Sequence, residues 1–225
     1  MTTLDAEKPL IKPEGMMAKY VGKKVLVVGA HPDDIELGAG GTVARLAASG
    51  SDVRMVVVCT PNNLKARNEE SKAAARELGA KIEFLYDQRE MRVEDIKSYE
   101  LVSRIDQLVR ELDPAVVITH AASNFHHDHV LVYKACQAAQ RLHFFDMLCF
   151  YPNSCHPVTT PFHPQAYVDI SDVIGKKMAA IHKHTTQFTC RGLTTDHYVG
   201  VAREYGRLAG CEYAEGLEIS RINLG

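Results

Sequence analysis

The chain lacks an excess of charge of either sign, and it lacks any long apolar run. Its 225 residues include 26 Lys and Arg against 28 Asp and Glu, a net charge of −2. No basic surface is therefore expected to attract nucleic acid or anionic lipid. No segment approaches the roughly 20 apolar residues that cross a bilayer, and residues 1–18 lack the apolar core of a secretory signal. We expect a cytoplasmic protein without nucleic-acid or membrane partners.

Paired cysteine motifs are also absent. The chain has six cysteines and none forms a C-x-x-C pair, so we expect reduced thiols with structural roles. Histidine, by contrast, is unusually frequent. There are eleven histidines, and six of them lie between positions 120 and 156. A cluster of this kind calls for a chemical explanation.

Short apolar runs alternate with amphipathic segments along the chain. Strands are predicted near residues 23–29, 52–59, 82–85, 115–119, 147–150 and 167–170, with an extended tail after residue 210. Helices are predicted near residues 36–49, 64–78, 99–112, 129–142, 172–183 and 196–208. This order predicts an α/β fold with three Rossmann-like layers, in which helices cover both faces of a mainly parallel sheet. We expect one domain over residues 1–225, with residues 1–20 as a peripheral N-terminal arm.

The first predicted strand runs into Gly29-Ala-His-Pro-Asp-Asp34, a turn with one imidazole and two carboxylates. In open α/β sheets, ligands collect at the carboxyl ends of the strands. The glycine spacing argues against a dinucleotide site, because Val43 stands where the third glycine belongs. The two carboxylates would also repel a pyrophosphate. We interpret the glycines after the turn as positions where the helix approaches its neighbours closely.

A metal site is the better interpretation of this turn. Catalytic zinc takes three protein ligands and leaves a fourth position to water. His31 and Asp34 lie three residues apart across a proline turn, so their side chains can converge on one ion. The third ligand is expected from residues 124–129, just past the end of another strand. Asp33 is then placed as a general base for water whose pKa the metal lowers to about 7.

The segment 124–129 holds a second pair of chemical groups, His126 and Asp128. An aspartate that orients an imidazole favours the imidazolium, which can donate a proton to a leaving group. Arg67 is expected to contact substrate, since a guanidinium donates several hydrogen bonds to sugar hydroxyls. The alternative for Arg67 is a salt bridge to Glu69 or Glu70. No functional role is expected for six further histidines: His143, His156, His163, His182, His184 and His197.

Four motifs resemble those of the LmbE-like, or PIG-L, zinc de-N-acetylases. The segment 29–42, G-A-H-P-D-D-I-E-L-G-A-G-G-T, resembles the signature of that family. Residues 67–70 resemble its R-x-x-E helix, and residues 213–215 resemble its Y-A-E motif. Residues 126–129 resemble its H-P-D-H motif, with His127 in the place of proline. The family includes deacetylases of N-acetylglucosaminyl-phosphatidylinositol, of mycothiol and bacillithiol precursors and of chitobiose.

The resemblance implies hydrolysis of an acetamide by zinc-activated water, with one zinc ion per chain or another divalent metal. It implies three metal ligands: His31, Asp34 and His129. It further implies that Asp33 is the base. His126 would protonate the leaving amine or steady the tetrahedral intermediate, with Asp128 behind it. The implied substrate is a small N-acetylated amino sugar or its conjugate, and the implied assembly is a homo-oligomer, a trimer or hexamer.

Two other functions remain open at this point. One is zinc-dependent hydrolysis of another amide or of an ester. The other is a catalytically silent metal-binding protein on the same fold. Asp33 and His126 argue against a silent protein, because holding a metal requires neither residue.

Overall fold

The structure is a computed structural model that describes residues 15–152, 162–189 and 194–223. Its strands are β1 Lys24–Gly29, β2 Asp52–Cys59, β3 Lys81–Tyr86, β4 Val116–His120, β5 Asp146–Phe150, β6 Ala166–Asp169 and β7 Ala214–Arg221. Its α-helices are α1 Asp34–Ala48, α2 Leu64–Leu78, α3 Ser98–Leu112, α4 His127–Ala139, α5 Ile174–Ile181 and α6 Asp196–Ala209. Three short 3-10 helices complete the described elements: η1 Gly15–Tyr20, η2 Val93–Asp95 and η3 Ser171–Val173. Each strand predicted from an apolar run is present within a residue or two.

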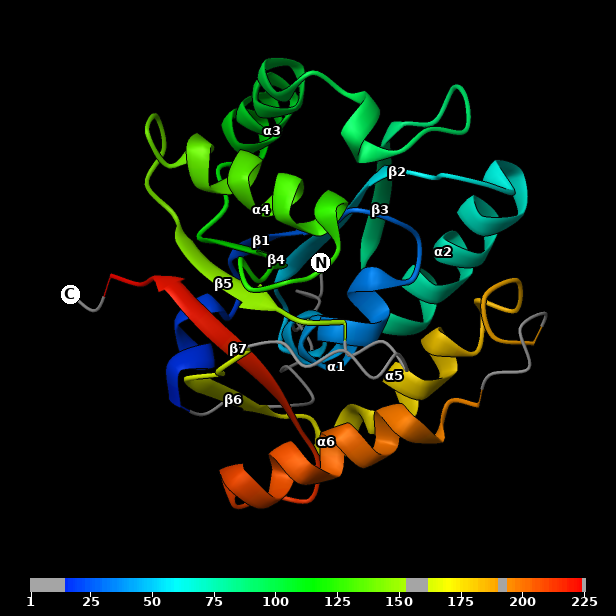
Figure 1. Cartoon of the computed structure of the whole chain (residues 1–225). Helices are drawn as coiled ribbons and strands as arrows, with labels where there is room; N and C mark the ends of the chain where they lie inside the picture. The colour runs from blue at the N-terminus through cyan, green and yellow to red at the C-terminus, as the bar shows by residue number, and fades with distance from the viewer. Residues whose placement is uncertain (1–14, 153–161, 190–193, 224–225) are drawn as a thin grey trace, which may run out of the picture.

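One seven-stranded sheet runs through the molecule in the order β3-β2-β1-β4-β5-β7-β6 (Figure 1). The first five strands in this order are parallel, whereas β7 is antiparallel to both β5 and β6. The predicted α/β fold with a mainly parallel sheet is therefore confirmed. The tail that was expected to be extended is β7, which enters the sheet between two earlier strands. Among the described residues, every helix is too short or too polar to cross a membrane.

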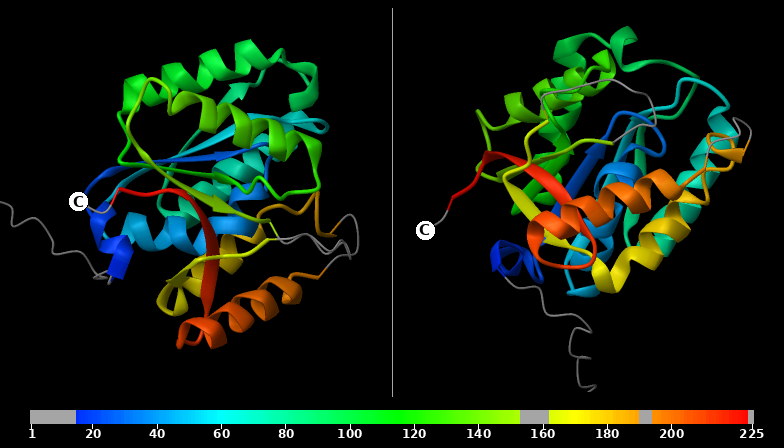
Figure 2. Two further views of the ribbon diagram at one scale, coloured as in Figure 1. Left: turned by 60° about the vertical axis from the view of Figure 1, so that its left-hand side comes forward. Right: turned by 60° about the horizontal axis from the view of Figure 1, so that its bottom comes forward.

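Helices cover both faces of the sheet, as the left view of Figure 2 shows. Alternate residues of a strand point to opposite faces. Val25 and Val27 accordingly pack in the core beneath α1 and α2, whereas Leu26 and Val28 pack in the core beneath α3 and α4. All four side chains are fully buried, and each such burial contributes about 1.5–3 kcal/mol. This two-sided burial explains why the strand sequences are uninterrupted apolar runs.

The N-terminal segment packs against the main core where the structure describes it. Residues 15–20 form η1, in which Met17 and Tyr20 are buried against the main core. The Tyr20 hydroxyl donates a hydrogen bond of 2.9 Å to Asp146, at the start of β5, and Lys19 pairs with the same carboxylate at 2.6 Å. Residues 15–20 are therefore docked on the core through an aromatic residue. Residues 1–14 lie outside the described chain.

The glycines of α1 allow close packing, as the sequence indicated. A Cβ atom on Gly38 would lie 2.2 Å from the Phe150 ring, and one on Gly41 would lie 2.7 Å from Ile170. On the same side of α1, the buried Glu215 carboxylate accepts hydrogen bonds of 2.8 and 2.7 Å from the backbone N–H groups of residues 41 and 42. Lys177 neutralises this carboxylate at 2.5 Å. These contacts fix α1, and with it the turn that precedes α1, against β7.

The sheet topology brings two segments distant in sequence to one edge. The strand β1 pairs with β2 on one side and with β4 on the other, with Val25 opposite Val53 and Val116. Helices connect these strands on opposite faces, so the chain reverses its winding direction between β1 and β4. A reversal of this kind creates the crevice in which open α/β sheets bind ligands. The crevice contains the turn after β1 and the segment after β4.

Candidate metal and catalytic site

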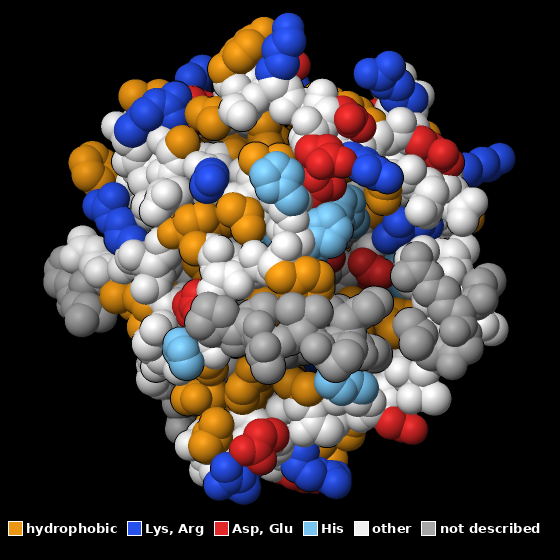
Figure 3. Space-filling view, in the orientation of Figure 1, with side chains coloured by type: hydrophobic (Ala, Val, Ile, Leu, Met, Phe, Trp, Pro, Cys, Tyr) orange, Lys and Arg blue, Asp and Glu red, His pale blue; other side chains and the backbone are white. Residues whose placement is uncertain are grey.

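The crevice is a cavity of about 550 Å³, a size suited to a small molecule. Its wall includes the turn after β1, the start of α4, part of α2 and the segment that follows α5. Histidine and acidic side chains gather at the surface beside the first turn of α4 (Figure 3). The structure therefore brings all seven predicted site residues to this cavity: His31, Asp33, Asp34, Arg67, His126, Asp128 and His129.

The backbone conformation of the turn after β1 directs the carboxylates of Asp33 and Asp34 away from each other. Asp33 has φ 93°, a left-handed conformation that costs a non-glycine residue about 1–3 kcal/mol. Asp34 begins α1 and points back, so that its Oδ2 atom accepts a hydrogen bond of 2.8 Å from the His31 N–H. Asp33 makes no capping hydrogen bond to the helix and faces the cavity instead. The strain thus directs neighbouring carboxylates toward different partners.

Both predicted histidine ligands lie near the carboxylate of Asp34, the third predicted ligand. The His31 Nδ1 atom is 3.6 Å from Asp34 Oδ2, and His129 Nε2 is 3.3 Å from Asp34 Oδ1. Two ligands about 2.1 Å from a tetrahedral zinc ion are about 3.4 Å apart. All three side chains are buried. Burial alone would raise the pKa of Asp34, but the neighbouring imidazoles outweigh it and hold that pKa well below its usual range.

The Asp128 carboxylate contacts His31 rather than His126. It lies 2.8 Å from His31 Nε2 and accepts hydrogen bonds of 3.0 Å from the backbone N–H groups of Val93 and Glu94. The expectation that Asp128 stands behind His126 is therefore wrong. These contacts outweigh the effect of burial and lower the pKa of Asp128 to about 2. A carboxylate that accepts the Nε2 proton of His31 leaves Nδ1 free to bind a metal.

His126 caps the helix α4. Its Nδ1 atom accepts a hydrogen bond of 3.2 Å from the Asp128 N–H, and its own N–H donates to Asn124 Oδ1 at 2.9 Å. Because Nδ1 accepts, the ring carries its proton on Nε2. Burial and the neighbouring His129 ring lower the pKa of His126. The side chain is therefore a neutral donor at the cavity.

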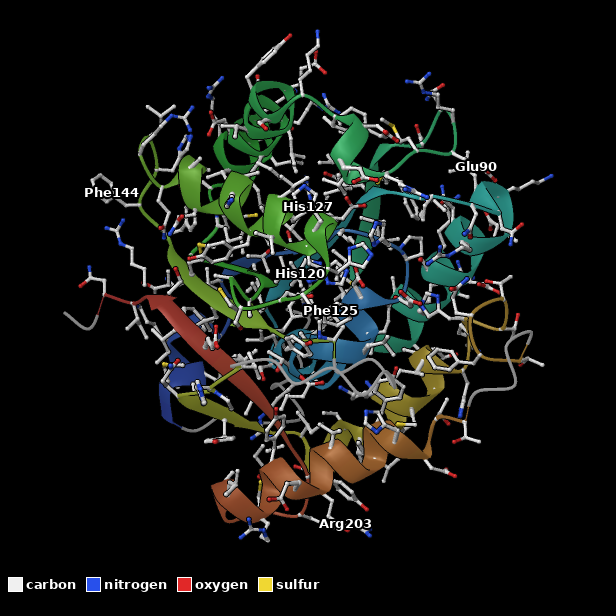
Figure 4. The ribbon with its side chains drawn as sticks, viewed as in Figure 1. Glu90, His120, Phe125, His127, Phe144 and Arg203 are labelled. Atoms are coloured by element: carbon white, nitrogen blue, oxygen red, sulfur yellow. The ribbon has the colours of Figure 1, made fainter. Side chains whose placement is uncertain are left out.

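His120 was not predicted as part of the site, yet it lies beneath it. It ends β4 and is fully buried (Figure 4), with its ring stacked 4.0 Å from that of His129. Its Nε2 atom lies 3.3 Å from Asp34 and accepts a hydrogen bond of 2.9 Å from the Ala30 N–H. Burial lowers the pKa of His120 to about 3, and the charge of the neighbouring His129 contributes a smaller part of this decrease. Its donor atom lies within 4.8 Å of donor atoms of Asp34 and His129, a group that could hold a metal ion, although the Ala30 N–H already occupies its Nε2 lone pair.

Arg67 reaches the turn after β1 from α2. Its Nη2 atom donates a hydrogen bond of 2.8 Å to the Pro32 carbonyl and lies 3.8 Å from Asp33 Oδ1. The alternative salt bridge is absent among the described residues. Glu69 pairs with Lys72, and Glu70 binds a turn after α5. The Nε atom of Arg67 is buried without a partner in the described chain, and the side chain lines the cavity.

The structure also shows where the remaining histidines and cysteines of the sequence analysis lie. His127, which replaces the family's proline, is exposed on the first turn of α4 (Figure 4). His184 was expected to be an ordinary residue, and it is fully buried 3.1 Å from Glu36. His156 lies outside the described residues, as do Cys155 and Cys190. The four described cysteines are all free thiols.

The mixed sheet is covered by helices on both faces and has a cavity at the carboxyl ends of its parallel strands. Imidazole and carboxylate groups that could hold a metal ion line this cavity, which is the architecture of an α/β enzyme. Residues 26–140 match the family described as PIG-L, GlcNAc-PI de-N-acetylase. An uncharacterized deacetylase of Escherichia coli, YaiS, is 31% identical over 72% of this chain and 90% of its own. The chain therefore belongs to the PIG-L family, and the predicted enzyme class of N-deacetylases is confirmed.

Two other similarities extend over most of the chain. The diacetylchitobiose deacetylase of Thermococcus kodakarensis is 28% identical over 87% of this chain and 82% of its own. The crystal structure of GalB, the 4-carboxy-2-hydroxymuconate hydratase of Pseudomonas putida, superimposes with a TM-score of 0.73. That match has 25% identity and covers 90% of this chain and 98% of GalB. Relatives of similar distance thus carry the names of a deacetylase and of a hydratase.

Proposed function

We propose that the protein is a zinc-dependent deacetylase that removes the acetyl group from an N-acetylated amino sugar or its conjugate. The observation that carries this proposal is the separation of Asp33 from Asp34. One carboxylate lies among imidazoles and the other faces the cavity on a strained backbone. A protein that only held a metal would gain nothing from this strain.

The chain's donor set fits zinc. The proposed ligand atoms are His31 Nδ1, a carboxylate oxygen of Asp34 and His129 Nε2, a combination of nitrogen and oxygen typical of catalytic zinc. A zinc ion bound there would polarise the acetyl carbonyl and lower the pKa of water to about 7. The contact between Asp128 and His31 supports this assignment, because it fixes the tautomer that a ligand needs.

Asp33 is proposed to take the proton from the attacking water. Burial and the adjacent Asp34 raise the pKa of Asp33 to about 6. A general base works best with a pKa near the pH at which it operates. Arg67, 3.8 Å away, keeps the ionised carboxylate from being isolated in the cavity wall.

His126 is proposed to steady the tetrahedral intermediate through its Nε2 proton. Of the two roles implied by the family resemblance, the hydrogen-bonding pattern favours this one. An imidazolium needs protons on both nitrogens, but Nδ1 already accepts the Asp128 N–H. A neutral ring keeps that cap and donates from its other nitrogen to a developing oxyanion.

The substrate class rests on the cavity and on Arg67. The cavity of about 550 Å³ accommodates a sugar ring with a substituent. Arg67 lines the cavity, and its guanidinium group suits a sugar hydroxyl. The predicted alternative, hydrolysis of another amide or ester, would use the same base and donor.

Acetate release from the zinc-loaded protein tests the proposal. We expect acetate from at least one of N-acetylglucosamine, diacetylchitobiose and N-acetylglucosaminyl inositol, together with the free amine. Acyl esters and an unsaturated dicarboxylate serve as parallel substrates for the ester and hydratase alternatives. Turnover confined to the esters or to water addition would contradict the proposal, as would the absence of all turnover in protein that binds zinc.

A homo-oligomer is proposed from the family resemblance. Leu142 and Phe144, beside β5, are 58% and 90% exposed and would gain from burial at an interface. Light scattering is expected to give the mass of a trimer or a hexamer. A monomeric mass at all concentrations would contradict it.

A further inference from the structure

The helix α2 contacts two different walls of the cavity from one of its faces. Arg67 binds the turn after β1 through the Pro32 carbonyl. Glu70, one helical turn later, reaches the segment that follows α5. Its Oε1 atom accepts hydrogen bonds from the Thr185 hydroxyl at 2.7 Å and from the Thr186 N–H at 2.9 Å, and its Oε2 atom accepts from the Thr186 hydroxyl at 2.6 Å. Three donors on one carboxylate hold this segment tightly.

Gln187, the residue after Thr186, lies on the cavity wall. Gln187 is buried and lines the same cavity as His31 and Asp33. Its Nε2 atom donates a hydrogen bond of 3.3 Å to the Thr186 hydroxyl. Because a carboxylate only accepts hydrogen bonds, that hydroxyl must donate to Glu70 and offer its lone pairs to Gln187. The sequence of bonds from Glu70 through Thr186 therefore orients the Gln187 amide.

Glu70 is ionised for this role. Burial alone would raise the pKa of Glu70, but the hydrogen bonds from Thr186 and Thr185 outweigh it and lower that pKa. An alanine at position 70 would remove both acceptor oxygens. The Thr186 N–H and the two threonine hydroxyls would then lose their shared acceptor, so the replacement would release the turn.

We propose that Gln187 is a specificity-determining residue that hydrogen-bonds a hydroxyl of the substrate's sugar ring, and that Glu70 is a positioning residue for it. The inference rests on the proposed function, since it names the part of the substrate that this wall recognises. Arg67 and Gln187 would then bind polar groups of the ring from two walls, both positioned by α2. Neither Glu70 nor Gln187 touches a proposed metal ligand through any hydrogen bond of the described chain.

Binding measurements test this inference separately from catalysis. The protein is zinc-loaded and carries Asp33→Asn, so that ligand is not consumed. Two ligands are compared by calorimetry: N-acetylglucosamine, and N-acetylcyclohexylamine, which has the ring and the acetamide without hydroxyls. We expect Gln187→Ala and Glu70→Ala each to weaken N-acetylglucosamine binding by roughly 5- to 10-fold, the effect of one hydrogen bond. Binding of N-acetylcyclohexylamine and zinc content should not change.

Glu69→Ala is the matched control, because Glu69 is the exposed neighbour that pairs only with Lys72 among the described residues. Equal effects of Glu69→Ala and Glu70→Ala would overturn the positioning role. Equal losses for both ligands in Gln187→Ala would overturn the specificity role, as would failure of N-acetylglucosamine to bind. The proposed function fails on a different result, the absence of acetate release by the protein with Asp33 intact.

Discussion

The turn after β1 and the segment after β4 reach the same cavity by opposite means. In the turn, one strained residue, Asp33 at φ 93°, divides two adjacent carboxylates between two tasks. In the segment, an unstrained helix begins at His127 and presents successive side chains at helical spacing. The turn stores strain of about 1–3 kcal/mol to place its groups, whereas the helix places its groups through capping. Function is therefore more sensitive to the backbone in the first region and to the side-chain partners in the second.

The largest loss of activity should come from replacing Asp34 or His129, residues through which the two regions contact each other. Asp34 lies 3.3 Å from His129 and 3.6 Å from His31. We expect Asp34→Ala and His129→Ala each to lose bound zinc and all measurable acetate release, because two ligands do not hold a catalytic zinc ion. Metal content by mass spectrometry and acetate release measure the two effects. Retention of stoichiometric zinc by either variant would contradict the ligand assignment.

Asp33→Asn should separate catalysis from metal binding within the first turn. Asparagine tolerates a left-handed backbone, so the variant should fold and keep its zinc. Turnover should fall by about 10²- to 10⁴-fold, the usual contribution of a general base. Asp33→Gly should be equally inactive and about 1 kcal/mol more stable, because glycine relieves the strain. Thermal unfolding measures this difference.

The pH dependence provides an independent check on Asp33. The base must be deprotonated, and its pKa is raised to about 6 in the metal-free chain, while a bound cation would lower it. The acidic limb of kcat/KM should therefore fall at or below about pH 6 in the zinc-loaded protein. A limb well above that pH would assign the titration to another group.

In the second region, His126→Asn and His126→Ala should both lower turnover, but only one of them should also lower the stability of the fold. Both remove the Nε2 proton, so turnover should fall by roughly 10²- to 10³-fold with zinc retained. Asparagine is a good helix cap and alanine is not. Only the alanine variant should therefore lose about 1 kcal/mol of unfolding free energy, measured by urea titration. Wild-type turnover in the asparagine variant would contradict the proposed role of His126.

The two regions also differ in how far the sequence predicts them. The groups of the first turn are neighbours in sequence, so His31 and Asp34 could be paired from their spacing alone. The partner of Asp128 could not be found in this way, because its N–H donors come from η2, about 35 residues earlier. His120 carries no spacing signal, since a single histidine at the end of a strand is usually structural. The parallel strands were readable as apolar runs, but the place of β7 depends on long-range pairing that local sequence does not encode.

The smallest effect should come from Asp128→Asn, and it tests the contact that the sequence did not predict. Asp128 accepts from His31 Nε2 and from two backbone N–H groups. The asparagine amide is neutral and cannot accept all three hydrogen bonds, so the acceptor that fixes the His31 tautomer is weakened. We expect zinc affinity to weaken by about 10- to 100-fold. Turnover should return toward the wild-type value as zinc is added in excess.

His127→Ala is the matched control for Asp128→Asn, because His127 is the exposed neighbour on the same helical turn. Its zinc affinity should equal that of the wild type, which also tests whether His127 could replace His129 as a ligand. If Asp128 acted through His126 instead, Asp128→Asn would lower turnover at saturating zinc and leave affinity unchanged. A defect that excess zinc repairs therefore requires the carboxylate to act on His31, and so ties the second region to the first through a ligand of the metal.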